Sequence, residues 1–221
     1  MYRHCLKAPT SILTRSALFK PSITTRTMAT ISNRVSDKIK HDHAELKSYH
    51  SKIKSASTPT EKTKWQNQFV WELARHSVAE ELIVYPAFEK HLPGGEGTSI
   101  AARDRQEHQA VKHLLKDFQM MKAEDPQFDA KIDELWSVLQ QHILEEERDD
   151  LPVLEAAIDE RESEGLAKKF DRTKLFVPTQ SHPAAGSEGG IYESAMGLLG
   201  APVDKLMDLF KKFPEEGEKK I

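Results

Sequence analysis

Two halves of the chain repeat the same pattern of histidines and carboxylates, and this repeat restricts the possible folds more than any other feature. His43 and His108 each lie in the pattern acid-His-x-x-aliphatic-Lys, at an offset of 65 residues. His76 and His142 each begin the pattern His-x-x-x-Glu-Glu-x-x-x-x-Pro, at an offset of 66 residues. Each half therefore supplies one histidine from its first segment, and a histidine with a glutamate from its second.

The repeat lies in a region of helical periodicity. Apolar residues recur there with a period near 3.6, and turn signals divide the region into segments. The pattern predicts four helices, over residues 32–57, 59–91, 99–123 and 126–163. Pro86 and Pro152 are expected to kink the second and the fourth. Four helices joined by short loops predict an all-α fold, an up-down antiparallel four-helix bundle over residues 32–163.

The turn positions predict that the repeated residues lie at one height. Two residues on antiparallel helices are level when the turn falls midway between them. The midpoint of His43 and His76 falls in a Thr-Pro-Thr turn, and that of His108 and His142 falls at Asp-Pro. The midpoint of Glu80 and His108 falls at Gly-Gly. We therefore expect one layer in the bundle core, made of His43, His76, Glu80, His108, His142 and Glu146.

Such a layer is costly unless something satisfies it. Buried carboxylates without a partner shift their pKa or destabilise the fold. Divalent metal ions accept imidazole nitrogen and carboxylate oxygen together. Six protein ligands exceed the four of a closed zinc site. We therefore expect two ions, with Glu80 and Glu146 bridging them.

At these residues the sequence resembles the hemerythrin-like family, also called the HHE cation-binding domain, over roughly residues 35–160. The resemblance rests on the acid-His pairs and on the two His-x-x-x-Glu-Glu patterns, the first of which ends in Tyr85-Pro86. It implies a bundle that holds two iron ions in a non-haem di-iron centre, which an oxo or hydroxo group can bridge. It also implies binding of dioxygen or related small molecules, with the six residues of the layer as ligands.

Two positions depart from the oxygen carriers of that family. The carriers have a second ligand histidine one turn after the first on the third helix, where this sequence has Lys112. They also end with an aspartate five residues after the last histidine. Here Glu146 lies four residues after His142 and Glu147 lies five after. We expect Glu146 to be the ligand, with Glu147 as the alternative.

Three functions are compatible with this layer. The first is a binding protein, not an enzyme, that senses or buffers iron, dioxygen or nitric oxide. The sequence shows no nucleophile triad, phosphate-binding loop or His-Glu-x-x-His motif, which favours this function. The second is a di-iron oxidase or peroxidase acting on peroxide or reactive nitrogen species. The third is a metal-free helical scaffold.

The two ends of the chain have different compositions. Residues 1–27 are rich in Arg, Ser and Thr and contain no acid, which predicts a mitochondrial presequence, with a disordered basic tail as the alternative. Translation from Met28 would give a second, cytoplasmic form. Residues 166–221 are expected to form a C-terminal arm, irregular over 166–190 and with an amphipathic helix at about 191–213. We expect this helix to pack on the bundle, with a membrane surface or a partner as the alternative.

Composition and charge exclude several other classes of protein. Residues 1–36 carry six basic residues and no acid, so the rest of the chain is more acidic than the net charge of -3 indicates. An acidic body argues against nucleic-acid binding. Cys5 is the only cysteine, which excludes a disulfide framework within the chain and cysteine-based metal sites. No stretch approaches the roughly 20 apolar residues of a transmembrane helix.

Overall fold

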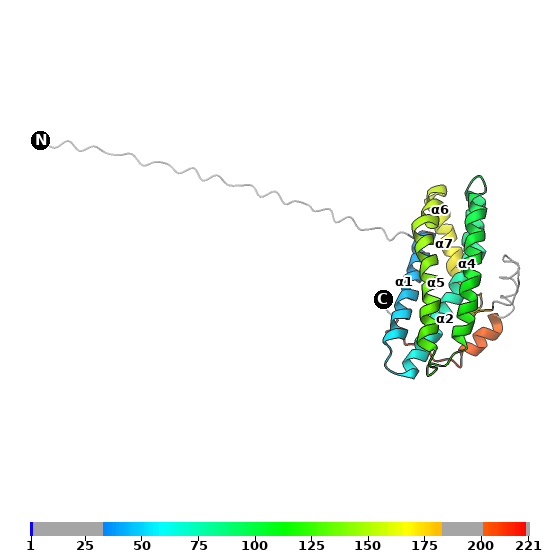
Figure 1. The fold of residues 1–221 in the computed structure, drawn as a ribbon. Helices are drawn as coiled ribbons and strands as arrows, with labels where there is room; N and C mark the ends of the chain where they lie inside the picture. The colour runs from blue at the N-terminus through cyan, green and yellow to red at the C-terminus, as the bar shows by residue number, and fades with distance from the viewer. Residues whose placement is uncertain (2–32, 183–200, 220–221) are drawn as a thin grey trace. The chain divides into compact units, whose positions relative to one another are not determined.

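Helices arranged around one core make up the structure, a computed structural model that describes residue 1, residues 33–182 and residues 201–219. The predicted presequence and Met28 lie outside these residues. The helical elements are α1 (Val35–Ser55), α2 (Pro59–Ala79), η1 (Glu80–Val84), α3 (Tyr85–His91), α4 (Glu96–Gln119), α5 (Phe128–Glu145), η2 (Glu146–Asp150), α6 (Leu151–Ala157) and α7 (Glu160–Lys174). The predicted all-α fold is confirmed (Figure 1).

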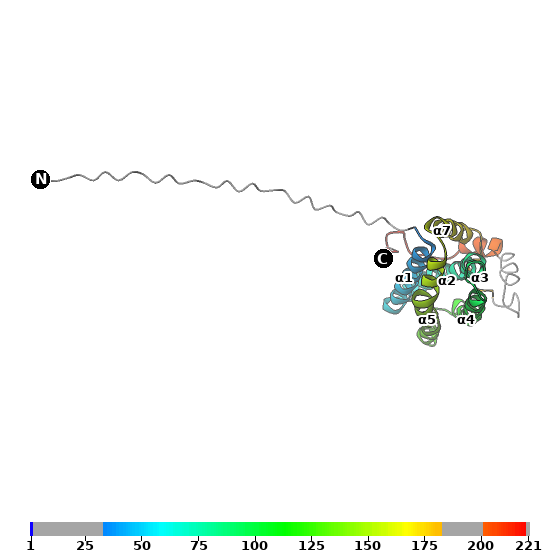
Figure 2. The same ribbon diagram turned by 90° about the horizontal axis from the view of Figure 1, so that it is seen from above.

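Four antiparallel segments form the predicted bundle. The first is α1, the second runs from α2 through η1 to α3, the third is α4, and the fourth runs from α5 through η2 to α6. Neighbouring segments pack in the order of the chain, and the fourth returns to lie against α1. Seen from above, the four segments surround the core, with α7 outside them (Figure 2). None of the described helices is long and apolar enough to cross a membrane.

The turns form where the sequence placed them. Thr58 caps α2: its hydroxyl oxygen accepts a hydrogen bond from the Glu61 backbone N–H, and Pro59 occupies the first turn. Gly94 and Gly95 connect α3 to α4 with φ values of +66° and +84°, a left-handed conformation that favours glycine.

Both interrupted segments contain a π-helical turn just before a proline. In η1 the Tyr85 N–H donates to the Glu80 carbonyl, and in η2 the Leu151 N–H donates to the Glu146 carbonyl. Proline cannot donate a helical hydrogen bond and crowds the carbonyl four residues before it. The prolines, for which a kink was predicted, thus each follow a π turn, and both π turns begin at a glutamate of the predicted layer.

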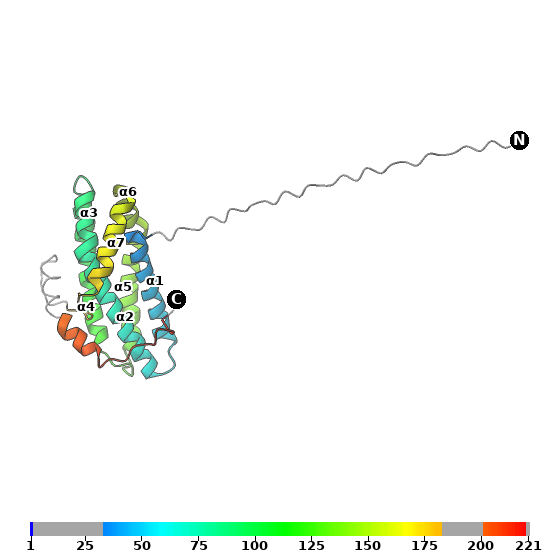
Figure 3. The same ribbon diagram turned by 180° about the vertical axis from the view of Figure 1, so that it is seen from behind.

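The prediction for residues 158–174 was wrong, because most of this stretch forms a separate helix, α7. The fourth segment ends at Ala157 instead of about residue 163, and residues 166–174, predicted to be irregular, are helical. Asp159 caps the new helix through a hydrogen bond from the Glu162 N–H to its carboxylate. α7 lies against α1 and α2 (Figure 3). It is fixed there by the fully buried Phe170 and by Lys174, so tertiary contacts stabilise a helix that few apolar residues mark.

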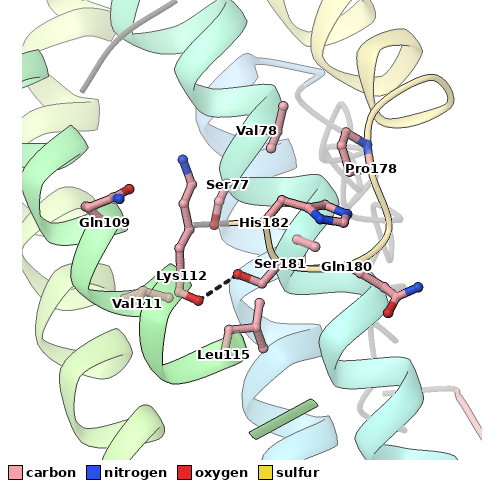
Figure 4. A pocket seen from close by; sticks show the side chains of 11 residues that line it. Ser77, Val78, Gln109, Val111, Lys112, Leu115, Pro178, Gln180, Ser181 and His182 are labelled. Carbon is pink, nitrogen blue, oxygen red and sulfur yellow. Dashed lines mark hydrogen bonds between the residues drawn. The ribbon is translucent and has the colours of Figure 1, made fainter. Parts of the chain in front are cut away.

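The segment after α7 crosses the outer side of α2 and α4. It borders a small pocket, where the Ser181 hydroxyl donates to the Lys112 carbonyl at 2.6 Å (Figure 4). His182, for which the sequence indicated no role, pairs with Asp204, with 2.9 Å between Nε2 and Oδ2. Residues 201–208 are helical, while the rest of the predicted connector and helix over 183–200 lies outside the described residues. Asp204 is buried, but Phe210 is 83% exposed.

The apolar core of the bundle is divided in two. One cluster contains Leu46, Leu73, Val111 and Leu139. The other contains Ile39, Val84, Ala101 and Leu151. Between these positions along each segment lie the histidines and glutamates of the predicted layer.

Candidate metal centre

The structure brings the six predicted residues together in the core. Every one of them has an exposed fraction of 3% or less. They come from all four segments: His43 from α1, His76 and Glu80 from the second, His108 from α4, and His142 and Glu146 from the fourth.

Glu80 lies between two halves of this cluster. Ligand-type atoms of His43, His76 and Glu80 lie within 4.8 Å of one another, and so do those of Glu80, His108 and His142. One Glu80 oxygen, Oε1, is 3.2 Å from Nε2 of His76. The other, Oε2, is 3.4 Å from Nε2 of His108. Glu80 thus directs one carboxylate oxygen to each half, and either oxygen could serve as a cation ligand.

Glu146 joins the cluster from the fourth segment, at the start of η2. Its Oε2 lies 3.5 Å from Nε2 of His43. Both carboxylate oxygens of Glu80 and Glu146, and Nε2 of His43, are buried and make no hydrogen bond to any described residue. Buried polar atoms are nearly always satisfied. Five such atoms in one buried cluster fit a cation site, because imidazole nitrogen and carboxylate oxygen are the ligands that iron and similar metals take together.

A ring of four outer carboxylates orients the histidines. Each imidazole directs Nδ1 away from the cluster, toward an acid on another segment. The four pairs, with their N–O distances, are His43 with Glu147 (2.8 Å), His76 with Asp42 (3.2 Å), His108 with Glu81 (3.2 Å) and His142 with Glu107 (2.7 Å). An Nδ1–H that donates to a carboxylate leaves the Nε2 lone pair free for a metal. The ring therefore selects the tautomer that a metal site requires.

The ring explains why acids occur next to the predicted ligands. Asp42 and Glu107 each precede a histidine of the layer, and Glu81 and Glu147 each follow a glutamate of the layer. In every doublet, one side chain faces the cluster and its neighbour reaches the histidine of the next segment. These acids are visible in the sequence, but spacing along one helix does not show which histidine of another helix each acid contacts.

The ring also separates the roles of Glu146 and Glu147. Glu146 is fully buried at the cluster, whereas the Glu147 side chain is 35% exposed and holds His43 from outside. Lys112, which stands where oxygen carriers have a further histidine, ion-pairs with Glu81 through Nζ. It therefore faces the ring and not the cluster.

Burial changes the protonation of the cluster. It lowers the pKa of His76 to about 3 and that of His108 to about 4, since the charged imidazolium is poorly solvated in the core. Burial, together with the charge of Glu146, raises the pKa of Glu80 well above its usual value. The imidazoles of His76 and His108 therefore favour the neutral state, in which a ring nitrogen can bind a metal.

Two further polar side chains border the half formed by His108 and His142. The hydroxyl of Tyr85, a fully buried residue, lies 2.9 Å from Nε2 of His108. Asp104, also fully buried, forms a third group of potential ligands with Glu107 and His142. Spacing alone did not predict either residue, because neither belongs to the repeated pattern.

Comparisons with known proteins agree with this geometry. Residues 34–154 match the hemerythrin HHE cation binding domain family. An uncharacterized hemerythrin-like protein of Schizosaccharomyces pombe is 52% identical over 181 residues, which cover 82% of this chain and 88% of that protein. A DNA nickase of Nostoc is 22% identical over 143 residues, and the match spans only 40% of its length.

A solved structure has a similar fold. It is a hemerythrin HHE cation binding domain-containing protein from Mycobacterium kansasii, with a TM-score of 0.56 and 24% sequence identity. The match covers 64% of this chain and 85% of that one. Together with the matched family and the buried cluster of histidines and glutamates, these similarities establish that the chain belongs to the hemerythrin HHE cation binding domain family and is a cation-binding bundle.

Proposed function

We propose that the bundle holds two iron ions at His43, His76, Glu80, His108, His142 and Glu146, and that it binds or senses iron, dioxygen or nitric oxide without catalysing a reaction. The observation that carries this proposal is the set of five buried, unsatisfied atoms that His43, Glu80 and Glu146 contribute to the core. When bound, the iron pair would supply the redox chemistry and the open coordination positions for a small molecule.

Pairing in the cluster supports two ions and not one. His43 and His76 form one half, His108 and His142 form the other, and Glu80 belongs to both. Two histidines and two shared carboxylates give each cation four protein ligands, so positions stay open on an iron that prefers six. Apolar clusters lie on both sides of the layer. These surroundings favour a small uncharged molecule over a large or charged one.

Metal analysis combined with an absorption spectrum under oxygen tests the proposal. We expect two iron ions per chain and the charge-transfer bands of oxidised di-iron, which zinc does not give. His142→Ala should lose iron and the bands. His41→Ala is the matched control, since the His41 side chain is 64% exposed and outside the cluster. A purified protein that takes up no iron or other divalent metal would favour the metal-free scaffold and refute the proposal.

Tyr85 supports a second candidate, a di-iron oxidase or peroxidase acting on peroxide or reactive nitrogen species. Its hydroxyl, 2.9 Å from Nε2 of His108, is a potential proton donor at the place where a small molecule would bind. The iron-loaded protein should then consume peroxide faster than the same concentration of free iron. Tyr85→Phe should slow that consumption without changing the iron content. A rate of peroxide consumption equal to that of free iron would rule out the enzyme and leave the binding function as the remaining candidate.

We further propose that residues 1–27 direct the protein to mitochondria and that a form beginning at Met28 stays in the cytoplasm. The arginine-rich, acid-free composition of residues 1–27 supports this. Mass spectrometry of the mature N-terminus from both compartments tests it. We expect cleavage near residue 27 in mitochondria and a start at Met28 in the cytosol. An intact residue 1 in both fractions would contradict it.

A further inference from the structure

The two halves of the cluster are related by the sequence repeat, but they are not equal. The offset of 65 residues that relates His43 to His108 also relates Ile39 to Asp104. Each lies one helical turn before its histidine and so on the same face of its helix. Both residues are fully buried. One half of the cluster is therefore bordered by an aliphatic side chain where the other half has a carboxylate.

The Asp104 carboxylate is only half satisfied. Its Oδ1 accepts hydrogen bonds from Nε and a terminal nitrogen of Arg103, at 3.2 and 3.0 Å. The same Arg103 terminal nitrogen also binds Oδ2 of Asp150 at 2.6 Å. Oδ2 of Asp104 is buried and makes no hydrogen bond to any described residue. A buried carboxylate oxygen without a partner costs free energy that the fold must recover elsewhere.

Asp104 borders the half of the cluster that His108 and His142 form. It belongs to a group with His142 and Glu107 in which potential ligand atoms lie within 4.8 Å of one another. Glu107 is engaged at Nδ1 of His142, on the outer side of that ring. Oδ2 of Asp104 is thus a fully buried carboxylate oxygen beside this half which, like those of Glu80 and Glu146, makes no hydrogen bond to any described residue.

We infer that Asp104 is a seventh ligand, which binds the cation held by His108 and His142. This inference rests on the proposed two-cation centre. The cation at His43 and His76 has no ligand equivalent to Asp104, because Ile39 at the corresponding position offers no ligand atom. The two positions are therefore unequal: the position at His108 and His142 binds its cation more tightly and fills first.

Titration of the metal-free protein with Co²⁺, followed by its visible absorption and by calorimetry, tests the inference. Wild type should bind two Co²⁺ ions per chain in two phases of different affinity. Asp104→Asn should weaken the tighter phase about tenfold or more and leave the weaker phase within about twofold. Asp104→Ile, which copies the residue of the other half, should make the two affinities similar. Circular dichroism of the metal-free variants checks that both still fold.

Asp150→Asn is the matched control, since it removes the same charge from the other carboxylate that Arg103 binds. If Asp104 is a ligand, Asp150→Asn leaves both phases within about twofold. His43→Ala should keep the tight phase and His142→Ala should lose it. Equal isotherms for wild type and Asp104→Asn, or equal losses in Asp104→Asn and Asp150→Asn, would overturn the inference while leaving the two-cation centre in place. A wild-type protein that binds no Co²⁺ would overturn both.

Discussion

Nδ1 of His43 on α1 lies 2.8 Å from Oε1 of Glu147 on η2, so the first and last segments of the bundle are joined at the cluster. This contact closes a ring in which every segment holds a histidine of the next one. An imidazole can take the correct orientation only when its neighbouring segment is in register. The ring therefore couples the register of the four segments to the orientation of the imidazoles at the centre.

Glu147→Gln should weaken binding of one cation without unfolding the bundle. The amide can accept a hydrogen bond from His43 but carries no charge, so the imidazole becomes a poorer ligand. Loss of such an outer carboxylate typically costs 10- to 100-fold in metal affinity, and we expect about tenfold here. A competition titration with a chelator measures it. Asp149→Asn, on the same π turn but paired with Arg148 at the surface, should leave the affinity unchanged.

Glu80→Gln should stabilise the metal-free protein and abolish binding of the cation pair. Burial raises the pKa of Glu80, so the folded state holds a proton there that the unfolded state has lost. Stability then falls as the pH rises above the unfolded value of about 4.3. Glu80→Gln has no carboxylate to ionise, so this loss of stability with rising pH does not occur in the variant. We expect a gain of about 1–3 kcal/mol in the free energy of unfolding at pH 8, and almost none at pH 4.

Chemical denaturation with a chelator present measures that difference. In the presence of excess metal the order should reverse, because only wild type gains the free energy of metal binding. A Glu80→Gln variant that is less stable than wild type without metal would mean that Glu80 has a structural partner in the fold, contrary to its unsatisfied oxygens.

The bundle, and the meeting of the six layer residues in its core, could be predicted from the sequence because both depend on spacing. Helical period and turn position determine which residues share a face and a height, and these are local properties. The structure differs from the sequence-based prediction where contacts between distant segments determine the conformation. α7 has few apolar residues and is stabilised by Phe170 and Lys174, and Asp104 lies in a charged stretch that looks solvated. Partners such as these come from segments distant in the sequence.

Gly97→Ala should destabilise the hairpin between α3 and α4. A Cβ at this position would lie 2.0 Å from the carbonyl oxygen of Phe88, so the two helices would have to separate. We expect a loss of about 1–3 kcal/mol in the free energy of unfolding, as for other overpacked sites. Thermal unfolding measures it. Gly165→Ala on α7 is the control: no atom lies within 4 Å of its added Cβ, and it should stabilise by about 0.5–1 kcal/mol. Equal effects at both positions would contradict the close approach.

Lys174→Met should release α7 from the bundle. Lys174 forms ion pairs with Asp42 and Glu72, whose side chains are 7% and 3% exposed, and its removal would leave two buried acids without this cation. Breaking a buried ion pair by removing one partner costs about 3–5 kcal/mol. Lys90→Met removes a pair that α7 makes at the surface, where the Lys90 side chain is 70% exposed, and should cost at most about 1 kcal/mol. Denaturation gives both values, and limited proteolysis should cut the Lys174→Met variant first between α6 and α7. Equal stability and equal resistance to proteolysis in the two lysine variants would contradict this prediction. α7 would then be fixed by Phe170 and its apolar neighbours, and Asp42 would serve only to orient His76.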